Sequence, residues 1–189
     1  MSEMRPTHGS RLLDVGITDS AWRSSNFIEA NYPWQSQITA VSVDPAPTFQ
    51  GHYPQVKVVI ADGKDLPFPD QSFEIGFSNA VIEHVGDRDE QRKFVAEMLR
   101  TCERVFIATP NARFPVDPHT LLPFAHWLPT RIWHRVLRAT GHEEWADLSR
   151  LNPLDARALR DLFPGSIPVR IVRQRLLGLT SVLIAITGE

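Results

Sequence analysis

The fold is decided by residues 61–85, which read Ala61-Asp-Gly-Lys-Asp-Leu-Pro-Phe-Pro-Asp-Gln-Ser-Phe-Glu-Ile-Gly-Phe-Ser-Asn-Ala-Val-Ile-Glu-His-Val85. Residues 56–61 lead into this stretch and residues 73–78 lie inside it, and each of these two runs has the length of a buried strand. Asp62 follows the first run and Asn79 follows the second. In open α/β sheets, ligands bind outside the carboxyl ends of the strands. The stretch therefore predicts two strands with a small-molecule pocket at one edge of their sheet.

The turn between the two runs carries a family resemblance. Residues 66–74 read Leu-Pro-Phe-Pro-Asp-Gln-Ser-Phe-Glu. They resemble the class I S-adenosylmethionine (SAM) dependent methyltransferases, particularly the small-molecule branch, in which such a turn joins a strand ending in Asp-Gly to a strand that leads into a His-containing helix start. The resemblance extends more weakly over residues 11–111 and the C-terminal strands. It implies an α/β fold: a doubly wound, mostly parallel seven-stranded sheet with an antiparallel C-terminal hairpin.

Length and charge limit the organisation of the chain. At 189 residues it can bury the core of one α/β domain, so residues 1–189 are predicted to form a single domain with an inserted segment at about 112–150. Twenty basic and 22 acidic side chains leave a net charge of −2. Nucleic-acid binding is therefore not expected.

The compartment follows from the cysteine count and the apolar runs. Cys102 is the one cysteine, which gives no disulfide framework and no metal spacing and suits a reducing cytoplasm. Residues 1–10 are polar and lack the apolar core of a signal peptide. The longest apolar run, residues 176–186, is interrupted and too short to span a bilayer as a helix, so we expect a cytoplasmic protein without stable membrane insertion.

The first predicted strand, residues 11–16, contains Asp14 and ends at Gly16. In the resembled family this strand continues as Gly-x-Gly-x-Gly, because glycine permits positive φ angles and close backbone approach to the cofactor. Here it continues with Ile-Thr-Asp-Ser, so two glycines are missing. Asp19 and Ser20 are expected either to cap a helix or to contact the methionine part of the ligand.

Three further strand ends are predicted to bind SAM by the same resemblance. Asp44 would accept hydrogen bonds from both ribose hydroxyls, although an Asp before Pro45 is also a common turn residue. Asp62 would accept from the adenine amino group with the Gly63 backbone beside it, although Asp-Gly is also a turn signal. The backbone carbonyl at Asn79 would help to hold the cofactor's ammonium. Asp14 and Gly16 complete the predicted cofactor set.

Catalytic candidates come from the chemistry of methyl transfer. Transfer from a sulfonium is an in-line displacement, which needs positioning and water exclusion but no obligatory nucleophile or metal. A hydroxyl or acidic carbon acceptor benefits from a general base, and histidine suits neutral pH. His84 occupies the position at which the resembled family carries its histidine, and His119 is the second candidate; a purely structural role for His84 is the alternative. A helix starting at Ala80, with Ser78 or Asn79 as its N-cap, is predicted before them.

The segment 112–150 and the C-terminal region complete the prediction. The segment is rich in histidine and tryptophan but shows no recognised metal-ligand spacing, so no metal site is predicted. Its apolar residues predict two short helices joined at Pro129, which either pack on the sheet edge or form an apolar substrate wall. Asn152 is predicted to cap a following helix. Residues 169–173 and 180–187 predict two strands, which must be antiparallel because their connection is short.

Two functional hypotheses follow. The first is a SAM-dependent methyltransferase that acts on a small acceptor, with the 112–150 segment favouring an apolar one. The second is a non-catalytic methyltransferase-fold module that has lost cofactor binding. A nicotinamide-dependent oxidoreductase is disfavoured because the chain lacks Gly-x-Gly-x-x-Gly. Since helices that precede the first strand in relatives have no counterpart here, a homodimer that supplies the missing cover is also an expectation.

Overall fold

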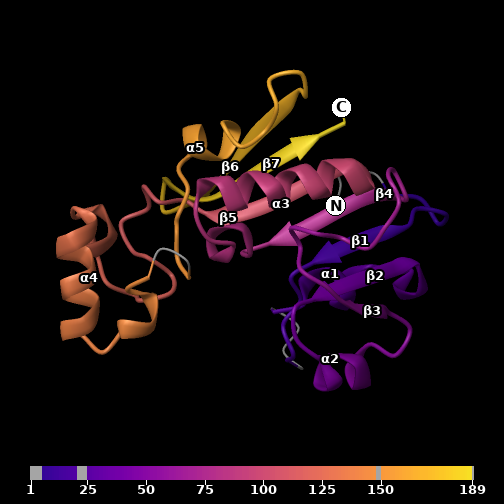
Figure 1. Ribbon diagram of the computed structural model, residues 1–189, viewed down its shortest axis with the longest axis horizontal. Coiled ribbons are helices and arrows are strands. Elements are labelled where there is room, and N and C mark those ends of the chain that lie inside the picture. The colour runs from indigo at the N-terminus through magenta and orange to yellow at the C-terminus, as the bar shows by residue number, and fades with distance from the viewer. Residues whose placement is uncertain (1–5, 21–24, 148–149, 189) are drawn as a thin grey trace. The chain divides into compact units, whose positions relative to one another are not determined.

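The computed structural model describes residues 6–20, 25–147 and 150–188 (Figure 1). The N-terminal residues 1–5 and Trp22, an apolar residue before the first predicted helix, lie outside the described residues. The helices and strands in chain order are β1 (Leu12–Val15), α1 (Phe27–Asn31), η1 (Gln35–Gln37), β2 (Ile38–Ser42), α2 (Pro47–His52), β3 (Lys57–Ile60), β4 (Phe73–Asn79), η2 (Ile82–His84), α3 (Arg88–Thr101), β5 (Cys102–Pro110), η3 (Ala125–Trp127), α4 (Thr130–Ala139), η4 (Glu143–Trp145), α5 (Ala156–Arg160), β6 (Val169–Leu176) and β7 (Leu179–Thr187), where η denotes a 3-10 helix.

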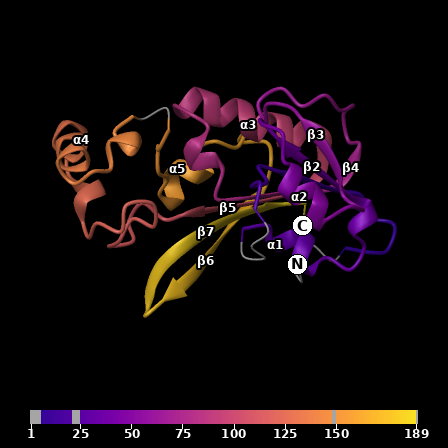
Figure 2. The same ribbon diagram turned by 90° about the horizontal axis from the view of Figure 1, so that it is seen from below.

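The seven strands form one sheet in the order β3-β2-β1-β4-β5-β7-β6. β1 pairs in parallel with β2 and with β4, and β2 pairs in parallel with β3. β6 and β7 form a hairpin that Figure 2 shows as one long twisted ribbon. Its two connecting residues, Leu177 and Gly178, both have positive φ angles (50° and 84°), as two-residue hairpin turns require. The predicted mixed α/β sheet with an antiparallel C-terminal hairpin is confirmed.

The chain forms two compact units. The first holds the residues up to Asn79 together with Phe94–Phe106 and the chain from Thr187. Its four N-terminal strands lie side by side, and Figure 1 shows α1 and α2 beside them in indigo and purple. The strand residues Leu12, Ile38 and Ile75 are almost completely buried, as expected for parallel strands whose side chains pack on both faces.

The second unit holds Ala80–Lys93 and Ile107–Ile186. Within it, Ala125, Trp133, Leu137 and Leu151 form a separate buried apolar cluster under η3 and α4. The two short helices predicted around Pro129 are thus present as η3 and α4. Among the described residues, no helix is both long and apolar enough to cross a bilayer.

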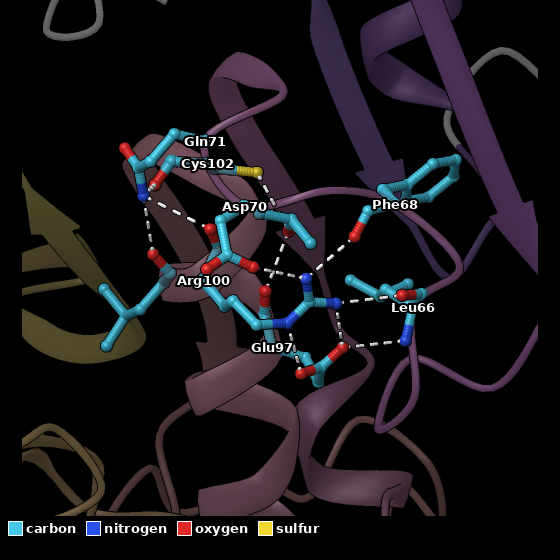
Figure 3. Close-up of polar contacts among 9 residues, drawn as sticks. Leu66, Phe68, Asp70, Gln71, Glu97, Arg100 and Cys102 are labelled. Carbon is cyan, nitrogen blue, oxygen red and sulfur yellow. Dashed lines mark hydrogen bonds and ion pairs between the residues drawn. The ribbon is translucent and has the colours of Figure 1, made fainter.

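The turn that carries the family resemblance is fixed by one arginine at the end of α3 (Figure 3). The Arg100 guanidinium donates to the carbonyls of Leu66 and Phe68 and to the carboxylates of Asp70 and Glu97. Glu97 in turn accepts from the backbone N–H of Leu66 at 2.8 Å. Hydrogen bonds from Arg100 lower the pKa of Glu97, and hydrogen bonds to Glu97 and Asp70 raise that of Arg100. The protein itself therefore holds the backbone of this turn at Leu66 and Phe68 and the side chain of Asp70.

Two predicted helix caps are wrong. No α-helix starts at Ala80; a 3-10 helix, η2, follows Val81 without a side-chain cap, and Ser78 instead donates its hydroxyl to the carbonyl of Val15. The positive φ angle of Ala80 (56°) breaks the chain direction there. The cap of α5 is Asp155, which accepts from the N–H groups of Arg157 and Ala158.

Asn152 binds elsewhere, because its side chain donates to the carbonyl of Gly86. Between β2 and β3, residues 47–52 form α2, with Pro47 in its first turn.

Candidate functional site

Register places the carboxyl ends of β1, β2 and β3 at the same edge of the first unit's sheet. Val15 pairs with Val41, and Ser42 pairs with Ile60. The N–H of Ala61 continues this ladder to the carbonyl of Ser42 at 2.9 Å. β4 joins the same edge through the pairing of Asp14 with Phe77. The predicted cofactor residues that follow these strands therefore share one edge.

The loop after β1 is held by side chains in place of the missing glycines. Gly16 has a φ of 100°, a conformation that favours glycine. The buried Asn26 amide donates to the carbonyls of Thr18 and Ser20 and accepts from the N–H of Thr18. Asp19 accepts from the N–H of Phe49 at 2.8 Å, in the first turn of α2. This is a long-range bond to α2 and not the cap of a helix that starts at Asp19.

The predicted cofactor residues after β2, β3 and β4 are exposed at this edge. Asp44 and Asp62 each lie two residues beyond their strands, and Asn79 is the last residue of β4. Asp62 accepts from the N–H of Lys64, whose ammonium lies 3.6 Å from the carboxylate. Gly63 is buried, and a β-carbon there would lie 2.6 Å from the Phe94 ring. Gly63 is therefore required for packing, while the two carboxylates face solvent.

Asp14, by contrast, is buried beside an acid that the sequence did not single out. Asp14 is only 6% exposed, and Glu29 of α1 is completely buried. Burial, with the nearby Glu29 carboxylate, raises the pKa of Asp14 well above its usual range, and burial likewise raises the pKa of Glu29. Neither carboxyl oxygen of Glu29 has a hydrogen-bond partner among the described residues. Burial therefore disfavours ionisation of both acids.

The second unit brings together the two predicted catalytic histidines. Their Nε2 atoms lie 3.0 Å apart, and Trp145 lies against both rings, with centroid distances of 5.6 Å to His84 and 5.2 Å to His119. The carbonyl of Arg150 lies 2.7 Å from Nδ1 of His84. Asp117 lies 2.9 Å from Nδ1 of His119. Each ring is therefore fixed by a partner on its Nδ1 side.

Backbone hydrogen bonds set the position of the His84 turn. The carbonyl of Glu83 accepts from the N–H of Asn152 at 2.7 Å. The Gln91 amide donates to the carbonyls of Ile82 and Asn152 and so joins the same two segments. Long-range contacts between residues 82–86 and 150–153 thus determine which side chains His84 meets.

Two acids complete this cluster. Burial alone raises the pKa of Asp117, but hydrogen bonds from His119 and Thr120 outweigh it, so the pKa is lowered and the group is a carboxylate. Glu83 is 1% exposed; its Oε2 accepts from the Thr109 hydroxyl at 2.9 Å, while Oε1 has no partner among the described residues. Burial raises the pKa of Glu83.

Comparison with known proteins identifies the family. Residues 13–104 match the family model described as a methyltransferase domain. A probable S-adenosylmethionine-dependent methyltransferase of Mycobacterium tuberculosis (strain ATCC 25618 / H37Rv) is 32% identical over 77 residues, which are 40% of this chain and 28% of that protein. These matches support a class I SAM-dependent methyltransferase domain. It spans less than a third of the length of the curated relatives it matches.

Solved structures show the same fold for this methyltransferase domain. A SAM-dependent methyltransferase of Methanosarcina mazei is 11% identical, with a TM-score of 0.60 over 98% of this chain and 94% of that one. The 1,6-didemethyltoxoflavin-N1-methyltransferase of Burkholderia thailandensis, with bound 1,6-didemethyltoxoflavin and S-adenosylhomocysteine, is 15% identical, with a TM-score of 0.57 over 97% and 76% of the two chains. The predicted family and its cofactor, SAM, are thus supported together.

Sequence reasoning missed two residues that organise the edge formed by the carboxyl ends of β1 to β4. Asn26 precedes α1, but its side chain turns back to hold the loop after β1. Glu29 was not considered, because no local pattern marks an acid in a five-residue helix as buried. In the second unit, Glu83 was noted only as the neighbour of His84.

Proposed function

We propose that this chain transfers the methyl group of SAM to a small-molecule acceptor. The observation that carries the proposal is the in-register edge of β1 to β4, from which the exposed carboxylates of Asp44 and Asp62 project beside a loop that begins at Gly16. Family membership supports the reaction, because residues 13–104 match a methyltransferase domain. Parallel α/β sheets bind ligands at such an edge.

Each of these residues binds a different part of SAM, as the family resemblance implies. Asp44 accepts from the two ribose hydroxyls, since one carboxylate can accept both hydrogen bonds. Asp62 accepts from the adenine amino group, and the Asn79 carbonyl faces the ammonium. Asn26 replaces the missing glycines by fixing the backbone of residues 18–20, so a loop without further glycines keeps one conformation.

The acceptor is a small molecule with an apolar part. Leu121, Phe124 and Trp127 of the second unit are each more than half exposed. The Trp127 indole donates to the carbonyl of Ala112, a residue that also lines a cavity with Glu83 and His119. Binding pockets are mostly apolar with a few placed polar groups. The neighbour from Burkholderia thailandensis has a small heterocycle bound, which supports the same class of acceptor.

His84 and His119 act on the acceptor. Both Nδ1 atoms have partners, so an acceptor's acidic group would meet the Nε2 side of these rings. Positioning and water exclusion provide most of the rate enhancement in methyl transfer, and activation of the acceptor adds to it.

Calorimetric titration with S-adenosylhomocysteine, the demethylated product of SAM, tests the cofactor site. The unmodified chain should bind one molecule, and Asp44→Asn and Asp62→Asn should each weaken binding by about 10- to 100-fold, because a hydrogen bond to a charged group is worth about 1.5–3 kcal/mol. Asp65→Asn is the matched control, since it changes an exposed acid of the same loop, and it should bind unchanged. Absence of saturable binding would leave only the non-catalytic alternative.

A further inference from the structure

The two histidines of the second unit face each other through ring nitrogens that both carry lone pairs. A carbonyl oxygen only accepts hydrogen bonds, so Nδ1 of His84, 2.7 Å from the Arg150 carbonyl, must carry a proton. The Asp117 carboxylate likewise accepts from Nδ1 of His119. In the neutral rings, both Nε2 atoms then carry lone pairs, and these atoms are 3.0 Å apart. Two facing lone pairs repel unless a cation lies between or beside them.

A third ligand atom converges on the same point. One ligand atom from each of Glu83, His84 and His119 lies within 4.8 Å of the other two. Glu83 is 1% exposed, and its Oε1 has no hydrogen-bond partner among the described residues. An unpaired buried carboxylate oxygen is costly, so it requires a cation or a donor. A single proton shared by the two imidazoles would leave Oε1 without such a partner.

The surrounding groups have the arrangement expected around a metal. Histidines that bind metals usually donate their other ring N–H to a carbonyl or a carboxylate, as His84 and His119 both do. Tetrahedral zinc at about 2.0–2.1 Å from two nitrogens would separate them by about 3.3 Å, close to the observed spacing. The adjoining cavity, lined by Glu83 and His119 among others, has a volume of about 10 Å³, about what one water requires.

We propose that Glu83, His84 and His119 form a divalent metal site of the zinc type. Two imidazole nitrogens and one carboxylate oxygen are a ligand set that catalytic zinc uses, with a fourth position left for water or substrate. Asp117 and the Arg150 carbonyl are positioning groups that hold the two rings. The sequence hid this site because its ligands come from segments 35 residues apart and include a glutamate without a motif.

A metal at this position gives the histidines a defined role in the proposed methyl transfer. An oxygen acid bound to zinc loses its proton at a lower pH than it does in water. The fourth position therefore suits an acceptor with a hydroxyl oxygen, which becomes a better nucleophile when the ion holds it. This consequence depends on the proposed function, whereas ion binding itself does not.

Zinc titration of the chelator-treated chain, by calorimetry with a competing chelator, tests the proposal. We expect one zinc per chain. His84→Gln and His119→Gln should each weaken binding by at least 100-fold, and Glu83→Gln should weaken it by at least tenfold. His142→Gln is the matched control because it removes a partly exposed histidine of the same unit, and it should bind like the unmodified chain. Cobalt(II) absorption provides a second measurement, since the three ligands predict the intense bands of a tetrahedral ion.

Circular dichroism and S-adenosylhomocysteine titration of each variant separate loss of the site from loss of the fold. Folded His84→Gln and His119→Gln that bind the product normally but no zinc would support the proposal. Zinc binding that is absent in the unmodified chain, or equally strong in the folded His119→Gln, would overturn it. A chain that binds zinc but not S-adenosylhomocysteine would overturn the proposed function and leave the metal site standing.

Discussion

Two clusters of charged side chains in this molecule differ in how completely their polar atoms are hydrogen-bonded. Around Arg100, in the first unit, the guanidinium donates to two carbonyls and two carboxylates, and the Leu66 N–H completes the bonding of Glu97 (Figure 3). Around Glu83, in the second unit, one carboxylate oxygen has no partner among the described residues, and two imidazole nitrogens face each other. A satisfied network needs nothing further, whereas an unsatisfied one indicates a ligand.

This difference in hydrogen bonding separates structural from functional residues. Both the turn at residues 66–74 and the segment around His84 resemble the family. The turn at residues 66–74 gives the strongest resemblance, yet the polar contacts of Arg100 and Glu97 there fix the chain. The His84 segment is weaker as a motif, but its polar atoms converge on one point without neutralising one another. Buried polar groups are normally hydrogen-bonded, so exceptions are informative.

Replacement of Arg100 by methionine is expected to have the largest effect on stability, because it removes the central donor of the hydrogen-bonded cluster. The variant keeps much of the packing but leaves Glu97 and two carbonyls without their donor, so unfolding free energy should fall by about 2–3 kcal/mol. Chemical denaturation measures this loss. Arg92→Met, which removes only an exposed i,i+3 ion pair with Asp89, should change stability by less than about 0.5 kcal/mol. Equal effects of the two changes would contradict the contrast.

Asn26→Ala tests a satisfied network that serves a ligand. Loss of three buried hydrogen bonds should lower the unfolding free energy by about 2 kcal/mol and weaken S-adenosylhomocysteine binding by about tenfold or more, because the loop after β1 is released. Asn31→Ala is the control, since this exposed amide bonds only to its own helix. If Asn26→Ala bound the product as tightly as Asn31→Ala, the loop would not need Asn26.

Glu29→Gln tests buried acids that lack hydrogen-bond partners, and its expected effect on stability is the smallest. Burial raises the folded-state pKa of Glu29 and Asp14 above the unfolded values of about 4, so the folded chain holds more protons and its stability falls as pH rises above about 4. Glutamine removes one titrating group. Between pH 5 and 7 the unfolding free energy of the variant should therefore fall less steeply than that of the unmodified chain. The two slopes should differ by at most about 1.4 kcal/mol per pH unit.

Denaturation at several pH values measures that slope. Glu103→Gln, at an exposed position, should keep the slope of the unmodified chain. A Glu29→Gln variant with the unchanged slope would show that the buried pair does not titrate in this range.

Much of the first unit was predictable because local patterns determine it. Apolar runs located β1, β3 and β4 of this unit to within about one residue, and the turn at residues 66–74 indicated the family. The caps were wrong where two polar residues competed: Asp155 caps α5, while Asn152 bonds to Gly86 across the chain. A cap depends on tertiary contacts as well as on local preference.

The candidate site was predictable only in part. His84 and His119 were each chosen by position, but their contact depends on how residues 117–119 and 150–153 pack against η2, which no local pattern specifies. Glu83 and Glu29 were missed for the same reason: burial turns an ordinary acid into an unusual one, and burial is a property of the whole fold.

Hydrogen–deuterium exchange with and without S-adenosylhomocysteine tests the central claim most directly, namely that this chain binds SAM at the β1–β4 edge with a loop that Asn26 holds. Saturating product should slow exchange in peptides that cover residues 16–20, 42–44 and 61–65. If the product bound but slowed none of these segments, or slowed exchange only elsewhere in the chain, the assigned cofactor site would be wrong.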